Sequence, residues 1–278
     1  MVLCTYNERE NIPSLISQLR ENIPGCEILV VDDDSPDGTG DWATQHAAQH
    51  EWSHVIVRKG ERGLGGAFRA ALQYSIQHDY TWLLNCDADH SHPPEQLANM
   101  LQVAIQSACE GAEAADVQAA NVQAADVQAA NVQAANVQAA DVQAADVQAA
   151  DVQAADVIVG SRYVPGGKVE GWPLRRRFMS RLVNRFAVTC LRLPVNDCSG
   201  SMRCYRVSML RRLPLDRLRS NGYAFLEELL VYLDHAGARM IEYPITFTDR
   251  QTGDSKLTLR ETIRAAWFLL GLSFTRPR

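Results

Sequence analysis

Short apolar runs alternate with amphipathic stretches along the first 110 residues, and this alternation restricts the fold more than any other feature of the chain. Strand-like apolar runs occupy residues 1–4, 27–31, 55–57 and 81–85. Helical spacing of apolar residues occupies residues 11–21, 41–50, 65–78 and 94–108, and a further buried strand is expected at 156–160. Strands that alternate with helices predict an α/β fold whose parallel sheet is covered on both faces.

Polar clusters follow three of these runs, at the points where the predicted strands end. They are residues 5–8, 32–34 and 87–89. The carboxyl ends of parallel strands meet at one edge of a sheet, and ligands bind beyond that edge. We therefore expect these clusters to form one ligand site.

The motif Asp87-Ala88-Asp89 carries the sharpest chemical signal. Two carboxylates separated by one residue can share a hard divalent cation such as Mg²⁺ or Mn²⁺. Such a cation can bind the oxygens of a diphosphate and stabilise it as a leaving group. The alternative is a solvated acidic loop, which the preceding apolar strand makes less favoured. His90 and His92 can extend the ligand set, but we expect them to shape the loop before the next helix.

Two other motifs allow more than one interpretation. Residues 32–39 combine carboxylates that can bind ribose or base with turn residues that can cap a helix, and we expect both roles at different positions. Residues 61–66 form a glycine-rich turn before a helix. That turn lacks the Lys-Ser/Thr of a phosphate-binding P-loop, so by itself it is weak evidence.

A five-residue unit, Asp/Asn-Val-Gln-Ala-Ala, is repeated eight times over residues 116–155. As a helix it would lack an apolar stripe, because Val rotates by roughly 140° per unit. A pentapeptide-repeat β-helix and a disordered tandem expansion are the alternatives. None of the three supplies chemistry, so we interpret the repeat as an insertion between residues 1–115 and 156–278.

Charge is distributed unevenly between the two parts of the chain. Residues 1–156 hold 6 Lys/Arg and 23 Asp/Glu, a net of −17, whereas residues 157–278 hold 21 and 10, a net of +11. The basic part is expected to meet something anionic: nucleic acid, lipid headgroups or a phosphorylated substrate. Nucleic acid is disfavoured, because the aromatic residues lie within apolar runs rather than among exposed basic residues.

The sequence predicts a cytosolic protein that binds a membrane only peripherally. No window reaches about 18 uninterrupted apolar residues, and seven cysteines without close pairing fit a reducing compartment. Residues 175–186 interleave five arginines with apolar side chains, which predicts a basic amphipathic helix in the headgroup region. The alternative is a basic helix packed on the domain. Residues 263–274 are a candidate second interfacial element.

A set of motifs in a fixed order resembles the dolichol-phosphate mannosyltransferase branch of the family 2 glycosyltransferases. The motifs up to the strand after the repeat are Cys4-Thr5-Tyr6-Asn7-Glu8-Arg9-Glu10-Asn11, the Asp-rich segment 31–39, Gly63-Leu64-Gly65, Asp87-Ala88-Asp89 and, beyond the repeat, Gly160-Ser161-Arg162-Tyr163. The later motifs are Asp197-Cys198-Ser199-Gly200-Ser201-Met202-Arg203, Gly222-Tyr223-Ala224-Phe225 and Arg250-Gln251-Thr252-Gly253-Asp254-Ser255-Lys256-Leu257. The resemblance covers nearly all of the chain outside the repeat.

The resemblance implies a GT-A fold, which is a Rossmann-like nucleotide-sugar transferase domain with a mixed, mostly parallel sheet. Donor contacts would come from Cys4, Tyr6, Glu8, Val31, Asp33, Asp87, Ala88, Asp89, Arg162, Arg250 and Lys256. Asp87 and Asp89 would hold the Mg²⁺ or Mn²⁺, and the catalytic set would be Asp89, Arg162, Arg250 and Lys256. Arg162, Arg176 and Ser180 would bind the acceptor phosphate. Cys4 replaces the usual Pro, and Asp34 replaces Asn or Gly.

The implied reaction is inverting transfer of mannose from GDP-mannose to a dolichyl or polyprenyl phosphate at the cytosolic face of a membrane, with a tethering subunit as a possible partner. The acceptor phosphate is already ionised near neutral pH, so no strong general base is required. A polyprenyl-phosphate glucosyltransferase or another UDP-sugar transferase is the nearest alternative. A nucleotide-sugar-binding scaffold that carries the repeat is the non-enzymatic one.

Overall fold

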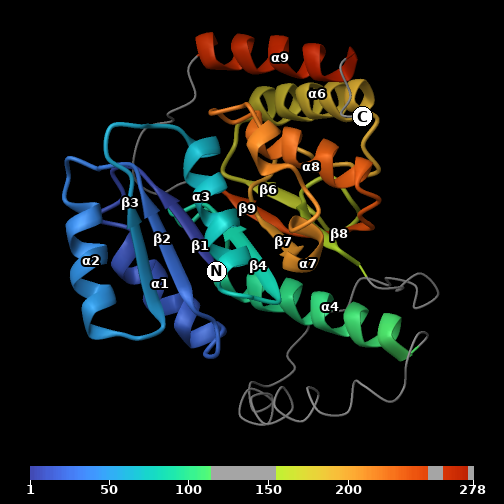
Figure 1. Ribbon diagram of the computed structural model, residues 1–278. Coiled ribbons are helices and arrows are strands. Elements are labelled where there is room, and N and C mark those ends of the chain that lie inside the picture. The colour runs from blue at the N-terminus through green and yellow to red at the C-terminus, as the bar shows by residue number, and fades with distance from the viewer. Residues whose placement is uncertain (114–154, 250–258, 275–278) are drawn as a thin grey trace.

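The computed structural model describes residues 1–113, 155–249 and 259–274 (Figure 1). Its main sheet comprises β1 (Val2–Thr5), β2 (Ile28–Asp32), β3 (Ser53–Val57), β4 (Trp82–Cys86), β5 (Val157–Ser161), β7 (Arg203–Arg206) and β8 (Met240–Pro244). A separate parallel pair comprises β6 (Lys168–Glu170) and β9 (Thr246–Thr248). The helices are α1 (Ile12–Asn22), α2 (Thr39–Gln49), α3 (Leu64–Gln77), α4 (Pro94–Glu113), α6 (Leu174–Leu191), α7 (Val207–Leu210), α8 (Phe225–His235) and α9 (Leu259–Phe274), with a 3₁₀ turn at Leu215–Arg217.

The main sheet has the order β3-β2-β1-β4-β7-β5-β8. All its neighbouring strands are parallel except that β7 runs antiparallel to both β4 and β5. The predicted mixed, mostly parallel sheet is confirmed. Because β7 is reversed, the loop that precedes it lies at the same edge as the carboxyl ends of β1, β2, β4 and β5.

Alternating side chains of the strands divide the core into two layers. In β2, Leu29 and Val31 face a layer that includes residues of α3, α6, α7, α8 and α9. Ile28 and Val30 face the opposite layer, with residues of α1, α2 and α4. This follows from the two-residue period of a strand, which sends successive side chains to opposite faces. Strands buried on both sides therefore read as continuous apolar runs.

The predicted strands and helices of residues 1–108 and 156–160 are present, with ends displaced by a few residues at most places. The largest difference is at the C-terminal end of α4, which reaches Glu113 rather than residue 108. The repeat lies outside the described residues apart from Ala155, which is buried beside β5. Cys4, Cys26, Cys86, Cys190, Cys198 and Cys204 are free thiols. No helix of the described residues is long and apolar enough to cross a bilayer.

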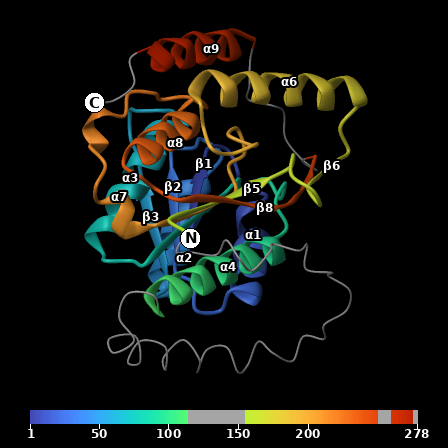
Figure 2. The same ribbon diagram turned by 90° about the vertical axis from the view of Figure 1, so that its right-hand side faces the viewer.

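Helices α6 and α9 lie side by side as an outer layer, at the top of both ribbon views (Figures 1 and 2). α6 contributes only Asn184, Ala187 and Leu191 to the buried interior. Residues 174–179 of α6 are exposed, as are Trp267 and Phe274 of α9. The alternative expectation, a basic helix packed along the domain, therefore holds only for the C-terminal part of α6.

Candidate functional site

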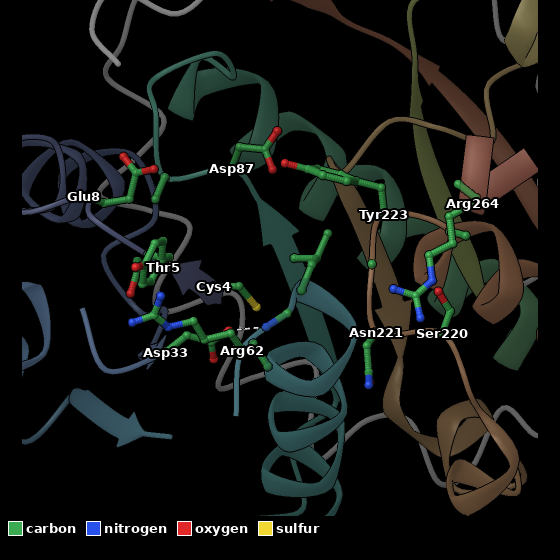
Figure 3. Close-up of a pocket in the computed structure, with 18 of the residues that line it drawn as sticks. Cys4, Thr5, Glu8, Asp33, Arg62, Asp87, Ser220, Asn221, Tyr223 and Arg264 are labelled. Carbon is green, nitrogen blue, oxygen red and sulfur yellow. Dashed lines mark hydrogen bonds between the residues drawn. The ribbon is translucent and has the colours of Figure 1, made fainter. Parts of the chain in front are cut away.

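A cavity of about 750 Å³ opens at the carboxyl edge of the sheet (Figure 3). Both parts of the chain line it, although the repeat separates them in sequence. The first part contributes Cys4, Thr5, Tyr6, Glu8, Asp33, Arg62, Gly63, Leu64, Ala67, Asp87, Ala88 and Asp89. The second contributes Arg219, Ser220, Asn221, Gly222, Tyr223, Ala224, Arg264, Ala265 and Phe268. The three polar clusters expected to meet at this edge do meet there.

The acidic turn after β4 places Asp87 and Asp89 on the cavity wall. Ser91 donates two hydrogen bonds to Oδ1 of Asp89, one from its N–H at 3.1 Å and one from its hydroxyl at 2.5 Å. These bonds fix the orientation of the carboxylate. The local geometry of the turn thus orients the carboxylate of Asp89.

The two histidines of this turn take different places. His90 has a positive φ of 60° and its Nε2 lies 3.0 Å from Ser14 Oγ, so it ties the turn to α1. His92 is buried, and among the described residues its Nδ1 has no hydrogen-bond partner. Burial lowers the pKa of His92, with the Asp87 and Asp89 charges acting in the opposite direction. His90 therefore shapes the loop, as predicted.

The two acids that end β2 have separate roles. Asp32 accepts hydrogen bonds from Thr5 Oγ1 at 2.8 Å and from the N–H and hydroxyl of Ser35, at 2.8 and 2.6 Å, so it builds the turn. Asp33 faces the cavity and binds Arg58 Nη1 at 2.5 Å and the N–H of Gly63 at 2.7 Å. Burial raises the pKa of Asp33 despite these partners. The turn role expected in this segment thus falls to Asp32, and Asp33 is the acid of the two that lines the cavity.

The other residues expected to contact the nucleotide-sugar lie at the end of β1, just after it, and inside β2. Cys4, Tyr6 and Glu8 line the cavity, and burial raises the pKa of the Cys4 thiol, which keeps it protonated. Arg62 lies over the Tyr6 ring, 4.6 Å from its centroid. The side chain of Val31 is fully buried in the core, so a donor can reach this residue only through its backbone.

Arg162 lies just beyond β5 and forms a buried ion pair with Asp197 of the loop before β7. Its Nε is 2.7 Å from Asp197 Oδ2, and its Nη2 is 2.8 Å from Oδ1 and 2.8 Å from Ser199 Oγ. Burial alone would raise the pKa of Asp197, but the charge and hydrogen bonds of Arg162 together lower it. Both groups are therefore held in their charged forms.

The residues expected to bind the acceptor phosphate form a separate cluster. Tyr163 connects two of them, because its ring lies 5.1 Å from the Arg162 guanidinium and its hydroxyl lies 2.9 Å from Ser180 Oγ. Arg176 stacks over Trp172 at 4.0 Å and pairs with Asp249 at 3.2 Å. None of Arg162, Arg176 and Ser180 lines the cavity. Arg250 and Lys256 lie outside the described residues.

Sequence reasoning did not assign the wall made by the second part of the chain. Ser220, Asn221 and Tyr223 face Asp33 and Asp87 across the cavity, and Arg264 of α9 closes one side (Figure 3). The motif at 222–225 marked this segment only through the family resemblance. No local sequence pattern predicts that residues 220–223 pack near the Gly63–Gly65 turn, some 155 positions earlier in the chain.

The donor set at Asp87 and Asp89 fits a divalent cation. Both carboxylates are hard oxygen ligands on one turn, and both line the same cavity. Within the described ranges no group of three or more His, Cys, Asp and Glu completes a closed metal cluster. An open site of this kind leaves positions for diphosphate oxygens and water.

Comparison with known proteins identifies the family of the chain. Residues 1–115 match the family described as glycosyl transferase family 2. The undecaprenyl-phosphate mannosyltransferase of Micrococcus luteus is 34% identical over 257 residues, which is 92% of this chain and 86% of that protein. The polyprenol monophosphomannose synthase of Mycolicibacterium smegmatis is 33% identical over 269 residues, which is 96% of this chain and 83% of that protein.

Solved structures give the same architecture. Glucosyl-3-phosphoglycerate synthase from Mycobacterium tuberculosis, in complex with Mn²⁺ and UDP-glucose, superposes with a TM-score of 0.56 at 15% identity, over 99% of this chain and 77% of that one. This likeness establishes the GT-A fold and nothing about substrate. Taking the sheet edge together with the two mannosyltransferase relatives, we conclude that the chain is a glycosyltransferase and belongs to the polyprenyl-phosphate mannosyltransferases of glycosyltransferase family 2.

Proposed function

We propose that this protein transfers mannose from GDP-mannose to a dolichyl or other polyprenyl phosphate, with inversion at the anomeric carbon and with Mg²⁺ or Mn²⁺ at Asp87 and Asp89. The observation that carries the proposal is the shared cavity, which combines Asp33 after β2 with the paired acids after β4. Relatives named for polyprenyl-phosphate mannosyl transfer at 33–34% identity supply the substrate class.

The cavity suggests where each part of the donor binds. The nucleoside would lie beside Tyr6, Glu8 and Asp33, whose polar atoms can meet ribose hydroxyls and base N–H groups. The diphosphate would lie toward Asp87 and Asp89. The metal bound there would neutralise charge on the departing diphosphate.

The reaction needs little from the protein beyond positioning and positive charge. A phosphate oxygen of the acceptor attacks the anomeric carbon, the bond from that carbon to the donor diphosphate breaks, and GDP leaves with the electron pair. The acceptor is already an anion, so no side chain has to remove a proton. Arg219 and Arg264 on the cavity wall are cations that can stabilise the charge of the leaving group, as we expect of Arg162, Arg250 and Lys256.

The acceptor would approach from the side of α6 and α9. Arg162, Arg176 and Ser180 lie on that side, and Phe268 of α9 lines the cavity itself. A phosphate on a long apolar chain could therefore reach the donor while its chain stays in the bilayer.

The exposed face of α6 supports peripheral docking on a membrane. Its exposed apolar side chains are Leu174, Phe178, Met179, Leu182, Val183 and Phe186, and Phe178 is 68% exposed. Arg175, Arg177, Arg181 and Arg185 are exposed among them. Apolar side chains between arginines suit the headgroup region of an anionic membrane. We place the protein at the cytosolic face, and a tethering subunit remains a further prediction.

Transfer of radiolabelled mannose from GDP-mannose to a polyprenyl phosphate in detergent tests the proposal. The wild type should form a labelled lipid with Mn²⁺ or Mg²⁺, and EDTA or Asp89→Ala should abolish it. Asp79→Asn, which changes an exposed acid at the opposite edge of the sheet, is the matched control and should retain activity.

The other outcomes select between the alternatives. Product from UDP-glucose but not from GDP-mannose would assign the protein to glucosyl transfer. No product from either donor, with nucleotide binding retained, would indicate a nucleotide-sugar-binding scaffold.

A further inference from the structure

The glycine-rich turn before α3 is in close backbone contact with residues 220 and 221. The N–H of Gly65 donates to the carbonyl of Asn221 at 3.1 Å. A Cβ on Gly65 would lie 2.1 Å from the carbonyl oxygen of Ser220, and one on Gly63 would lie 2.4 Å from that of Asn221. Backbone atoms cannot yield as a side chain can. Both glycines are therefore required by contact with residues 220 and 221.

The same turn is anchored on its other side to the nucleotide end of the cavity. The N–H of Gly63 donates to Asp33 Oδ2 at 2.7 Å, and Arg58 binds the other oxygen of that carboxylate. Gly63 also has a φ of 133°, which L side chains rarely adopt. The turn therefore connects Asp33 with the 220–221 backbone.

Arg69 grips the segment from one turn further along α3. Its Nη1 donates to the carbonyl oxygens of Leu218 at 3.2 Å and Ser220 at 2.9 Å. Its Nη2 donates to Asn221 Oδ1. One guanidinium thus uses its fork to bind three acceptors of a single loop, which a lysine could do only in part.

Glu228 grips the same segment from α8 and uses the opposite polarity. Its side chain is 2% exposed, and its two carboxylate oxygens accept the N–H groups of Arg219 and Ser220, both at 2.9 Å. Arg69 of α3 donates to carbonyl oxygens and Glu228 of α8 accepts from amide N–H groups. The backbone of residues 218–221 is therefore held from two helices. Without these partners, the backbone N–H and C=O groups of residues 218–221 would have to bind water instead.

The clamped segment is the cavity wall opposite the acidic turn. Arg219, Ser220, Asn221 and Tyr223 line the cavity, and Figure 3 shows Tyr223 pointing toward Asp87. We propose that Gly65, Arg69 and Glu228 are positioning residues that hold residues 218–224 against the nucleotide-sugar site and thereby set the affinity for the donor. This inference rests on the proposed function for the identity of the donor.

Steady-state kinetics with donor and acceptor varied separately test the proposal. Arg69→Ala loses charged hydrogen bonds, and Gly65→Ala forces its Cβ against the Ser220 carbonyl oxygen. Each variant should raise the KM for GDP-mannose by about tenfold and leave the KM for the acceptor within about twofold. Arg69→Lys should restore part of the donor KM. Gly25→Ala is the matched control, because a Cβ there meets nothing within 4 Å.

A double-mutant cycle and hydrogen exchange separate positioning from general destabilisation. The double variant Arg69→Ala/Asn221→Ala should raise the donor KM by less than the two single variants would together. The reason is that Arg69 acts partly through its hydrogen bond to Asn221. Exchange at the Arg219 and Ser220 amides should accelerate in Glu228→Gln, while the core amides of β2 stay protected. A fall in kcat and Tm with unchanged donor KM would overturn the proposal, and so would unchanged exchange at these amides.

Failure of the proposed function would look different. If the wild type transfers no mannose, binding of GDP and of UDP and the exchange measurement still test the clamp. Weakened nucleotide binding in Gly65→Ala would then support the clamp although the reaction assignment had failed. Unaltered binding of both nucleotides in Gly65→Ala and Arg69→Ala would reject it.

Discussion

Arg162 and Asp197 form a two-pronged ion pair although 35 positions separate them in the sequence. Arg162 is 7% exposed and the Asp197 side chain is fully buried. The pair joins the end of β5 to the loop before the reversed strand β7, and Ser199 provides a further hydrogen bond. A cation that the family resemblance assigns to phosphate binding is thus held in place by an acid of the same motif set.

Removal of the acid from this pair should destabilise the fold. Asp197→Asn leaves the buried guanidinium without its counter-charge, and we expect a loss of about 3 kcal/mol in the free energy of unfolding. Denaturant titration checks this. Asp79→Asn, which breaks the exposed pair with Arg211, should cost less than about 1 kcal/mol. Equal losses in the two variants would contradict the prediction.

Glu227 should make stability depend on pH. Burial raises its pKa from 4.5 to about 7, and its Oε2 has no partner among the described residues. The folded protein therefore binds this proton more tightly than the unfolded chain. The contribution of Glu227 to the free energy of unfolding should fall as pH rises from about 4.5 to about 7, and stay low above that.

The variant Glu227→Gln removes this titration. At pH 8 we expect it to be more stable than the wild type by about 1–3 kcal/mol, and at pH 4.5 the difference should vanish. Urea unfolding at both pH values measures it. A difference that does not change with pH would show that Glu227 is not the titrating group.

Metal removal should act on nucleotide binding rather than on folding. Asp87 and Asp89 lie on an open turn at the cavity, so the fold does not depend on a closed metal cluster there. EDTA should weaken GDP binding by about tenfold or more and shift the Tm by no more than a few degrees. Titration calorimetry with GDP and thermal unfolding, each with and without Mn²⁺, measure the two effects. Asp87→Asn should bind GDP equally with Mn²⁺ and with EDTA.

Membrane binding should depend on both kinds of side chain on α6. Replacement of Arg175 and Arg185 by Gln should weaken binding to anionic vesicles by about 30-fold, at roughly 1 kcal/mol for each charge, and the loss should shrink at high salt. Phe178→Ser should weaken binding at all salt concentrations, because it removes apolar area. Vesicle co-sedimentation measures both.

The control for this prediction is Arg212→Gln, an exposed arginine after α7 that removes the same kind of charge from outside the α6 surface. Binding that falls as much in this variant as in the α6 variants would indicate attraction by net charge alone. Binding to neutral vesicles that matches binding to anionic ones would also contradict the prediction.

The sequence by itself determined the α/β class, the strand ends and the residues of the acidic turn. These features are local: a buried parallel strand is a continuous apolar run, and the polar residues that follow it must lie at the sheet edge. For that reason the acidic turn at Asp87 and Asp89 could be assigned from the order of residues alone, whereas Asp33 is singled out among its neighbours only by the family resemblance; all three line one cavity. The repeat at 116–155 offered no pattern that selects among its three interpretations.

Only the tertiary structure decided how the two parts of the chain share the site. Reversal of β7 brings Asp197 to Arg162, and the Gly63–Gly65 turn meets the carbonyls of residues 220 and 221. From the local sequence, Arg69 and Glu228 look like ordinary polar residues of amphipathic helices. Their partners are backbone groups, which every residue carries, so no side-chain pattern in the sequence records them. Contacts of this kind exist only once the strand order has set which distant segments adjoin.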